Sequence, residues 1–226
     1  MDSSDPAVIT HVGIAESAAA ALTVALVADA LDFLGLREQV ISPTVRPIQP
    51  GVRLIGRARP IEVRASDVVP DEPYVGEMAA LAALAPGDIA CYHVDPAVEA
   101  ALFGELFAVA ARAQGAVGAV LDGPVRDVRQ MRELGFPVFA SGISPYDTKG
   151  RAEVVAHDAP VTCGGVLVSQ GDLVVGDDDG VVVVPAARVA DVVTAVTAKL
   201  ADEHGALADL QSGLTVHEVW ERWKAF

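Results

Sequence analysis

The sequence predicts an α/β protein that ends in a helical extension, and three observations lead to this fold class. Between positions 116 and 142, a strand pattern, a helix pattern and a second strand pattern follow one another as in a β-α-β unit. Between Pro160 and Pro185, short Val-rich runs alternate with Gly and Asp turns, which is typical of an all-β face. From Ala186 onward the apolar residues return to helical spacing. We therefore expect one α/β/β domain over 1–185, and a helical extension over 186–226 that packs on this domain or on a neighbouring subunit.

The composition supports one sizeable hydrophobic core. Of the 226 residues, 52% are hydrophobic but only 5% are aromatic. Ala and Val must therefore supply most of the buried surface, and the helices and strands must pack closely around these small side chains. A chain this rich in apolar residues is not intrinsically disordered.

The first predicted elements are a helix, a strand and another helix. Apolar residues fall at helical spacing over 18–34, and Gly35 follows as a stop signal. Residues 53–64 alternate apolar side chains with Arg, which predicts a strand or a bent hairpin. A second helix is expected over 73–84.

The middle of the chain is expected to alternate between strands and helices. Gly and Pro divide it into a turn and five elements. These are the turn at 86–88, a buried strand over 89–94, a helix over 97–113, a strand over 116–123, a helix over 126–135 with Gly135 as its C-cap, and a strand over 136–142.

The C-terminal quarter is predicted to pass from strands to helices. Asp177, Asp178 and Asp179 lie between Val-rich runs without the alternating ligand positions of a calcium loop, so we interpret them as a β-turn. A long helix over 186–211 and a short amphipathic helix after Gly213 complete the chain. This tail is the expected oligomer contact, and Trp220 and Trp223 on it serve either internal packing or a partner.

The charge of the chain excludes direct nucleic-acid binding. There are 16 Lys and Arg against 31 Asp and Glu, a formal net charge of -15, and no basic run with interleaved aromatic residues, so counterion release from a phosphate backbone is not available. Such an acidic surface also opposes an anionic small molecule unless cations are concentrated locally.

The N-terminal residues and the cysteines suggest a cytoplasmic protein. No basic segment precedes an apolar stretch as in a secretory signal, and no apolar run is long enough to span a membrane. Cys91 and Cys163 are not spaced as a zinc knuckle or a disulfide framework, so we expect two buried, reduced thiols.

Charged residues follow the predicted strand that ends at Leu121. Asp122, Arg126 and Asp127 lie at the carboxyl end of this strand, where α/β proteins place ligands. The alternative is purely structural: Asp127 would cap the next helix and Arg126 would pair with a neighbouring carboxylate.

A second segment, FGELF at 103–107, favours the functional alternative. Gly104 interrupts an apolar helical pattern, where Gly costs about 1 kcal/mol relative to Ala. A helix that starts there would offer the amides of Leu106 and Phe107 to an anion. Glu105 would lie beside this site, Arg126 would supply a cation, and Asp127 would supply a metal ligand.

Together these segments resemble a known family. The pattern is GEL, followed by Arg-Asp within GxVxDGxVRD and then by LGFPVFAxG. It is similar to the metal-dependent class II pyruvate aldolases that cleave 4-hydroxy-4-methyl-2-oxoglutarate, a family shared with the regulator of ribonuclease activity A. The resemblance extends over roughly Thr23 to Gly213 and includes DAL at 29–31, PGD at 86–88 and DGVVVVP at 179–185. It implies a swivelling β/β/α domain assembled as a homotrimer or homohexamer with sites between subunits.

The resemblance also implies roles for individual residues. Asp127 would hold Mg²⁺ or Mn²⁺, and Arg126 would bind and polarise a small 2-oxo acid. The substrate carboxylate would lie at Gly104–Phe107, on the amides of Leu106 and Phe107. Glu105 stands where many relatives have Asp, and would act as an acid/base group through water. Glu203, or Asp202 in its place, would be the C-terminal acid that reaches into a neighbouring subunit.

The implied reaction is a metal-dependent carbon-carbon cleavage of a 4-hydroxy-2-oxo (di)carboxylic acid that gives pyruvate. Decarboxylation of oxaloacetate forms the same enolate, so we expect this activity as well. No Lys lies in a predicted buried strand, which argues against a Schiff-base route. Two alternatives remain: a non-catalytic, protein-binding oligomer like the ribonuclease regulator, and an enolate-stabilising enzyme that acts on another sugar acid.

Two further polar features stay open at this point. Arg57 and Arg59 share one strand face and either receive a substrate carboxylate or form salt bridges with the many acids. The polar loop over 141–151 is a lid, a subunit contact or a substrate contact.

Overall fold

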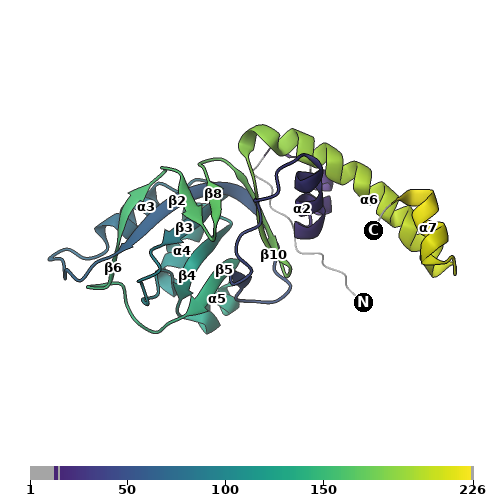
Figure 1. The fold of residues 1–226 in the computed structure, drawn as a ribbon. Helices are drawn as coiled ribbons and strands as arrows, with labels where there is room; N and C mark the ends of the chain where they lie inside the picture. The colour runs from purple at the N-terminus through teal and green to yellow at the C-terminus, as the bar shows by residue number, and fades with distance from the viewer. Residues whose placement is uncertain (1–12, 15, 225–226) are drawn as a thin grey trace.

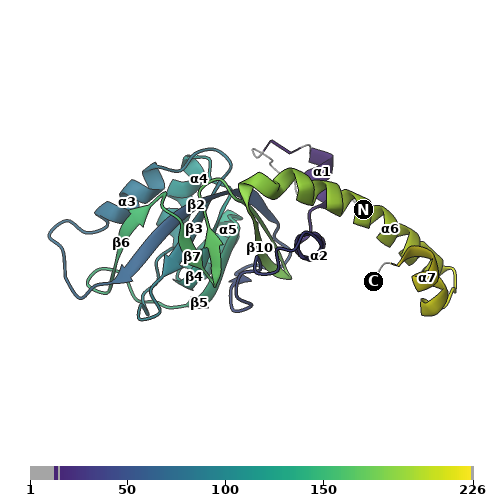
Figure 2. The same ribbon diagram turned by 45° about the horizontal axis from the view of Figure 1, so that its top comes forward.

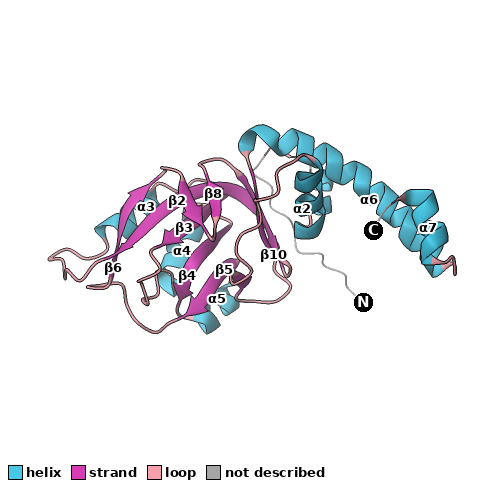
Figure 3. Ribbon diagram, viewed as in Figure 1, coloured by secondary structure: helices cyan, strands magenta, loops and turns pink. Residues whose placement is uncertain are grey.

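The computed structural model describes residues 13–14 and 16–224, and its centre is a mixed sheet. The main path runs β1-β5-β4-β3-β2-β9-β10, and β6 pairs with the far end of β2 (Figures 1 and 3). The strands are β1 Arg46–Pro47, β2 Leu54–Ala65, β3 Asp88–Val94, β4 Gly118–Val125, β5 Val138–Ile143, β6 Ala152–His157, β9 Leu173–Asp177 and β10 Gly180–Val184. A separate hairpin consists of β7 Val161–Cys163 and β8 Val166–Val168.

The four strands β2, β3, β4 and β5 are parallel to one another. Helices connect them, as parallel pairs require: α3 Val75–Ala82, α4 Glu105–Ala113 and α5 Val128–Leu134. All three helices cover the same face of the sheet (Figures 1 and 2). The carboxyl ends of β4 and β5 therefore meet at one edge of the molecule, next to the start of α4.

Three hydrophobic clusters surround the sheet. The first lies under α3, α4 and α5 and contains Tyr92, Phe103 and Met131. The second lies between the sheet and the β7-β8 hairpin and contains both cysteines, which are buried free thiols as predicted. The third joins β9 and β10 to the helices at the two ends of the chain. Ala and Val dominate all three, as the composition requires.

The C-terminal extension packs on the third cluster and then leaves the body of the protein. It begins with a short 3-10 turn, Ala186–Arg188, followed by α6 Val189–Gln211 and α7 Val216–Trp223. Val192 and Val196 of α6 are fully buried against this chain's own domain. The rest of α6 projects outward, and α7 folds back along it (Figure 1).

Trp223 anchors α7 to α6. Its indole lies against Gly205, where any larger residue would collide with the ring, and its Nε1 donates to Asp209 at 2.8 Å. Trp220 is 44% exposed, and the ammonium group of Lys224 lies 5.5 Å from its ring centroid. Trp223 thus serves internal packing, whereas Trp220 lies on the surface of the extension.

The predicted helix over 18–34 is wrong in one respect, because it is divided. The structure has α1 Glu16–Ala21 and α2 Val24–Phe33. Thr23 is the N-cap of α2, and its hydroxyl accepts from the Leu26 amide at 3.3 Å. Hydrophobic spacing continues through the break because both helices bury apolar residues in the third cluster, so periodicity alone does not reveal the cap.

One other prediction needs correction, and one strand was missed. The helix expected over 97–113 begins only at Glu105, because residues 95–104 form a loop that lies beside β4. The strand β6 was not predicted, since it follows directly on the polar loop. Of the two alternatives for residues 53–64, the strand is confirmed, as the single strand β2 Leu54–Ala65.

The remaining predicted elements are confirmed with small shifts of their ends. Asp178 and Asp179 form the two-residue turn between β9 and β10. Within the described part of the chain, no helix is both long and apolar enough to cross a membrane. The first twelve residues, which contribute to the expected absence of a secretory signal, lie outside the described residues.

Candidate active site

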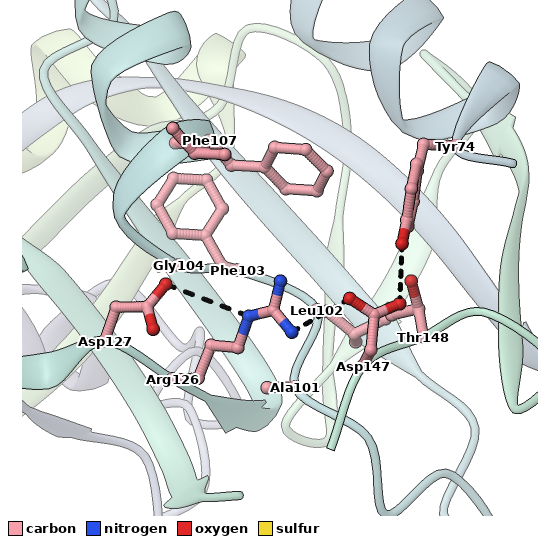
Figure 4. Close-up of a pocket in the computed structure, with 11 residues that line it drawn as sticks. Tyr74, Ala101, Leu102, Phe103, Gly104, Phe107, Arg126, Asp127, Asp147 and Thr148 are labelled. Atoms are coloured by element: carbon pink, nitrogen blue, oxygen red, sulfur yellow. Dashed lines mark hydrogen bonds and ion pairs between the residues drawn. The ribbon is translucent and has the colours of Figure 1, made fainter. Parts of the chain in front are cut away.

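A cavity of about 220 Å³ opens at the carboxyl ends of β4 and β5. It is bounded by the start of α4, the segment after β4 and the loop after β5. Tyr74, the residue immediately before α3, closes the remaining side (Figure 4). Its lining residues are Tyr74, Ala101, Leu102, Phe103, Gly104, Leu106, Phe107, Arg126, Asp127, Asp147 and Thr148. Five of the predicted site residues are among them: Gly104, Leu106, Phe107, Arg126 and Asp127.

Backbone pairing fixes Arg126 and Asp127 in this cavity. Phe103 forms an isolated parallel bridge with Val125, the last residue of β4, and the Arg126 amide donates to the Phe103 carbonyl at 3.0 Å. Asp127 then adopts a left-handed backbone conformation with φ of 55°. Non-glycine residues in this region are uncommon, although Asp and Asn tolerate it best. The turn brings the Asp127 side chain back toward the start of α4.

The carboxylate of Asp127 contacts α4 rather than its own helix. Asp127 occupies the N-cap position of α5 but makes no side-chain cap there. Its Oδ2 instead accepts from the Glu105 amide at 3.1 Å. A Cβ at Gly104 would lie 2.5 Å from the same oxygen, so only glycine permits this approach. The first part of the structural alternative, in which the Asp127 side chain caps α5, is therefore wrong, whereas its second part is confirmed, because Arg126 pairs with the carboxylate of Asp147.

The start of α4 leaves two amides free to bind an anion. The first hydrogen bond of the helix is donated by Ala108 to the Gly104 carbonyl. The amides of Leu106 and Phe107 precede it, and no described residue accepts from them. Both residues line the cavity. The Glu105 side chain is exposed and is not among the lining residues, and the Glu105 amide donates to Asp127.

The guanidinium group of Arg126 pairs mainly with a residue that the sequence analysis did not single out. Its Nη1 donates to Asp147 Oδ2 at 2.9 Å, whereas its Nε lies 3.8 Å from Asp127 Oδ2. Asp147 belongs to the polar loop after β5. The signal for it was available, because β5 is parallel to β4 and the loops after both strands must lie at the same edge of the sheet.

Asp147 is held by two further donors. The Tyr74 hydroxyl donates to its Oδ1 at 2.8 Å, and the Lys149 amide donates to the same oxygen at 2.9 Å. Burial opposes ionisation, but the bonds from Lys149, Tyr74 and Arg126 together hold the pKa of Asp147 below its usual range. The bond to Asp147 raises the pKa of Tyr74, so its hydroxyl remains protonated.

Aromatic rings form the apolar wall of the cavity. Phe103 is fully buried and packs edge-to-face on both Tyr92 and Phe107, with centroid distances of 6.1 and 6.4 Å. Phe136 stacks on its other side at 6.2 Å. This cluster gives the start of α4 a rigid base.

The structure places the other predicted residues away from this cavity. Glu203 and Asp202 lie on α6, which projects from the opposite end of the molecule from α3 (Figure 1). Glu203 lies 3.7 Å from Lys199. Arg59 forms salt bridges with Asp88 and Asp158, which is the structural use considered for it.

Asp127 suits a cation that needs few protein ligands. In the described ranges, no three His, Cys, Asp or Glu side chains are grouped to hold a metal ion. Asp127 is 38% exposed, and its Oδ1 has no described partner. A single open carboxylate does not suit Zn²⁺ or Ca²⁺, which need more protein ligands. It fits Mg²⁺, which keeps several waters and takes one or two carboxylates together with substrate oxygens.

Comparison with known proteins identifies the family. The model of the RraA-like group, described as aldolase/RraA, matches residues 24–183, which is more than half of the chain. The chain belongs to the aldolase/RraA family. The family resemblance found in the sequence motifs is thereby confirmed, and with it the α/β fold class with a C-terminal helix.

Similar proteins and solved structures are consistent with this assignment. The chain is 30% identical over 177 residues to a Halalkalibacterium halodurans protein named "Putative 4-hydroxy-4-methyl-2-oxoglutarate aldolase", a match that covers 78% of this chain and 79% of the relative. It superposes with a TM-score of 0.80 on an uncharacterized protein from Pseudomonas syringae pv. tomato, at 26% identity, covering 93% and 95% of the two chains.

A second similar solved structure comes from Streptomyces coelicolor. This protein, RraAS2, is described as an unusual member of the RNase ES inhibitor RraA family. The TM-score is 0.73 at 28% identity, and the match covers 88% of this chain and 95% of that one. Proteins similar to this chain thus carry two kinds of name: one refers to an enzyme, and the other refers to a ribonuclease inhibitor.

Proposed function

We propose that this aldolase/RraA protein is a divalent-metal-dependent carbon-carbon lyase that cleaves a 4-hydroxy-2-oxo acid to pyruvate by a retro-aldol route. The observation that carries the proposal is the meeting of Arg126, Asp127 and the free amides of α4 in one cavity. Two kinds of positive group, a guanidinium and a helix N-terminus, converge on a cavity that also holds the carboxylates of Asp127 and Asp147 and an aromatic wall. With a divalent cation on Asp127, this arrangement would give a chain of net charge -15 a local site for an anion.

The residues of the chain have distinct parts in substrate binding. The amides of Leu106 and Phe107 would bind the carboxylate of the 2-oxo acid, and Arg126 would bind its 2-oxo oxygen and stabilise the charge of the enolate. The wall formed by Phe103 and Phe107 excludes water from one side of the cavity. Asp127 would hold the cation, Mg²⁺ or Mn²⁺, which supplies Lewis-acid stabilisation of the developing negative charge.

Proton transfer needs further groups. We propose Glu105, acting through water, and an acid from the C-terminal extension of a neighbouring subunit, Glu203 or Asp202. A homotrimer or homohexamer with sites between subunits would supply the latter, since neither α6 residue lines the cavity of its own chain. Oxaloacetate decarboxylation gives the same enolate, so the same groups would serve this reaction.

Pyruvate release tests the proposal directly. Wild-type protein with Mg²⁺ should release pyruvate from 4-hydroxy-4-methyl-2-oxoglutarate or from oxaloacetate, and EDTA should abolish the activity. Asp127→Ala should lower turnover by about 100-fold or more, since an electrostatic group at the reacting atoms is typically worth this much. Asp191→Ala, on the exposed first turn of α6, is the matched control and should behave as wild type. Absence of metal-dependent turnover of both compounds would refute the proposal.

A second candidate function follows from the Streptomyces coelicolor relative. Its name supports a non-catalytic protein that binds a ribonuclease. Purified ribonuclease E-type enzyme would then bind the chain and lose activity, and Asp127→Ala would bind it as well as wild type does. An enolate-stabilising reaction on another sugar acid would instead appear as Asp127-dependent turnover in a panel of sugar acids.

A further inference from the structure

Two carboxylates hold the guanidinium group of Arg126, and one edge of it remains open. Nη1 donates to Asp147 at 2.9 Å, and Nε faces Asp127 at 3.8 Å. The remaining nitrogen, Nη2, points toward the aromatic wall of the cavity (Figure 4). No described residue accepts a hydrogen bond from Nη2. This edge is therefore the part of Arg126 that can meet a ligand.

Of the two carboxylates, Asp147 is the one that fixes the direction of the guanidinium group. Its Oδ1 is occupied by the Tyr74 hydroxyl and the Lys149 amide, which leaves Oδ2 aimed at Arg126. Tyr74 is itself constrained, since it has a left-handed backbone with φ of 66° immediately before α3. A continuous series of contacts thus extends from the start of α3 through Asp147 to Arg126.

We propose that Asp147 is a positioning residue, held by Tyr74, that keeps the open edge of Arg126 directed at the substrate. This inference rests on the proposed function, in which Arg126 binds the 2-oxo acid. The Arg126 side chain is 37% exposed and has several rotatable bonds. Without Asp147, it is free to turn toward solvent or to close on Asp127, and either movement removes the guanidinium group from the reacting atoms.

The proposal predicts a specific relation between two variants. Asp147→Asn keeps the shape of the side chain but removes the charge that holds Arg126, and should lower kcat/KM by about tenfold or more. Tyr74→Phe removes only the hydroxyl and should lower kcat/KM by roughly threefold. Because Tyr74 acts through Asp147, the double variant should be no slower than Asp147→Asn alone, which is the non-additivity expected for coupled residues.

The chain offers a matched control at another ion pair. Asp158 accepts from Arg59 at 2.7 Å and is 35% exposed, against 33% for Asp147. Like Asp147, it has a lowered pKa, held there chiefly by the hydrogen bond from its Arg partner. Asp158→Asn should therefore cost similar stability while leaving kcat/KM near the wild-type value.

Two measurements test the proposal on the full-length protein. The first is the kinetics of oxaloacetate decarboxylation with Mg²⁺ for the variants, together with their thermal unfolding. The second is the Nη1–H signal of Arg126 in the nitrogen-15 NMR spectrum, which reports the hydrogen bond to Asp147 and does not depend on turnover. We expect slow exchange of this proton in wild type and fast exchange in Asp147→Asn, with Tyr74→Phe between them.

The outcomes separate the positioning role from the proposed function. If wild type turns over no substrate, the proposed function fails, and the NMR signal alone decides whether Asp147 positions Arg126. If wild type is active but Asp147→Asn and Asp158→Asn have the same kcat/KM, the positioning role is refuted. It is also refuted if the effects of Asp147→Asn and Tyr74→Phe multiply in the double variant, or if the Arg126 signal is unchanged in Asp147→Asn.

Discussion

Gly104 shows how one missing methyl group organises the site. Its backbone is extended, so its φ does not demand glycine. The constraint is space, because a Cβ would lie 2.5 Å from Asp127 Oδ2 and 3.1 Å from Arg126 Cγ. The carboxylate can reach the Glu105 amide only because this methyl group is absent.

We therefore predict that Gly104→Ala damages the site more than the fold. The new methyl group must push Asp127 away from α4, and turnover should fall by about tenfold or more, as small misplacements of catalytic groups do. Gly142→Ala is the control, since a Cβ there meets only Pro124 at 3.8 Å. Steady-state kinetics and thermal unfolding of both variants check this. Equal turnover in the two would show that Asp127 needs no such close approach.

Glu77 provides a pH-dependent prediction beside the cavity. This carboxyl is buried, and Thr148 donates to its Oε1 at 3.4 Å. Burial raises its pKa above the ordinary value, and the charges of Asp147 and Glu153 act in the same direction. Its contribution to stability is thus complete below the unfolded pKa of about 4.3 and is lost as the pH rises through the folded pKa.

Glu77→Gln removes this loss, because the amide cannot ionise and can still accept from Thr148. In urea titrations the variant should be more stable than wild type at pH 8, and the difference should vanish near pH 4. Glu218→Gln is a control of opposite sign. The bonds from Thr215 lower the pKa of Glu218, so this variant should lose stability at neutral pH and not in acid. A Glu77→Gln curve parallel to wild type at every pH would contradict the assignment.

At the scale of elements, N-cap residues set helix boundaries that the spacing of apolar residues does not reveal. Apolar spacing was sufficient to find most helices and strands, because each buries one face in a cluster. It did not separate α1 from α2, since both contribute to the third cluster across the break at Thr23. It also extended the helix before Glu105 too far toward the N-terminus, because residues 98 and 100–103 are buried although they lie in a loop and not on a helix face.

The Thr23 cap yields a prediction for this element. Thr23→Ala removes the acceptor of the Leu26 amide and should cost about 1 kcal/mol of the free energy of unfolding. Thr23→Ser keeps the hydroxyl and should stay close to wild type. Urea denaturation measures both values. If Ala and Ser gave the same stability, the cap would have no energetic role here.

The candidate site shows a similar division between what the sequence reveals and what it does not. The motifs indicated Gly104, Arg126 and Asp127, because the spacing of Gly and charge around a helix start is local. Tyr74 and Asp147 were not found, since their hydrogen bond joins positions 73 residues apart. Only the packing of α3 beside the loop after β5 brings these two side chains together.

At the scale of the whole molecule, the two parts of the C-terminal extension differ in what they support. The first half of α6 buries Val192 and Val196 on the third cluster, and each buried Val contributes about 1.5–3 kcal/mol. The α7 helix packs mainly on the outer part of α6. The two halves should therefore respond differently to truncation.

We predict that a chain ending at Ser212 unfolds close to the wild-type temperature. A chain ending at Pro185 exposes the third cluster, and the lost burial of about 3 kcal/mol or more corresponds to a decrease of roughly 6 °C or more in Tm. Differential scanning calorimetry of both chains measures this. An unchanged Tm in the shorter chain would show that α6 contributes nothing to the domain.

The separation of the three clusters has a consequence for how this protein can diverge. The cavity is built on the first cluster, whereas α6 rests on the third, at the β9-β10 end of the sheet, and α7 packs on α6. Insertions, deletions or grafted sequences in α7 can therefore accumulate without disturbing the floor of the chain's own pocket. Related proteins can therefore keep the same pocket while they associate with different partner proteins.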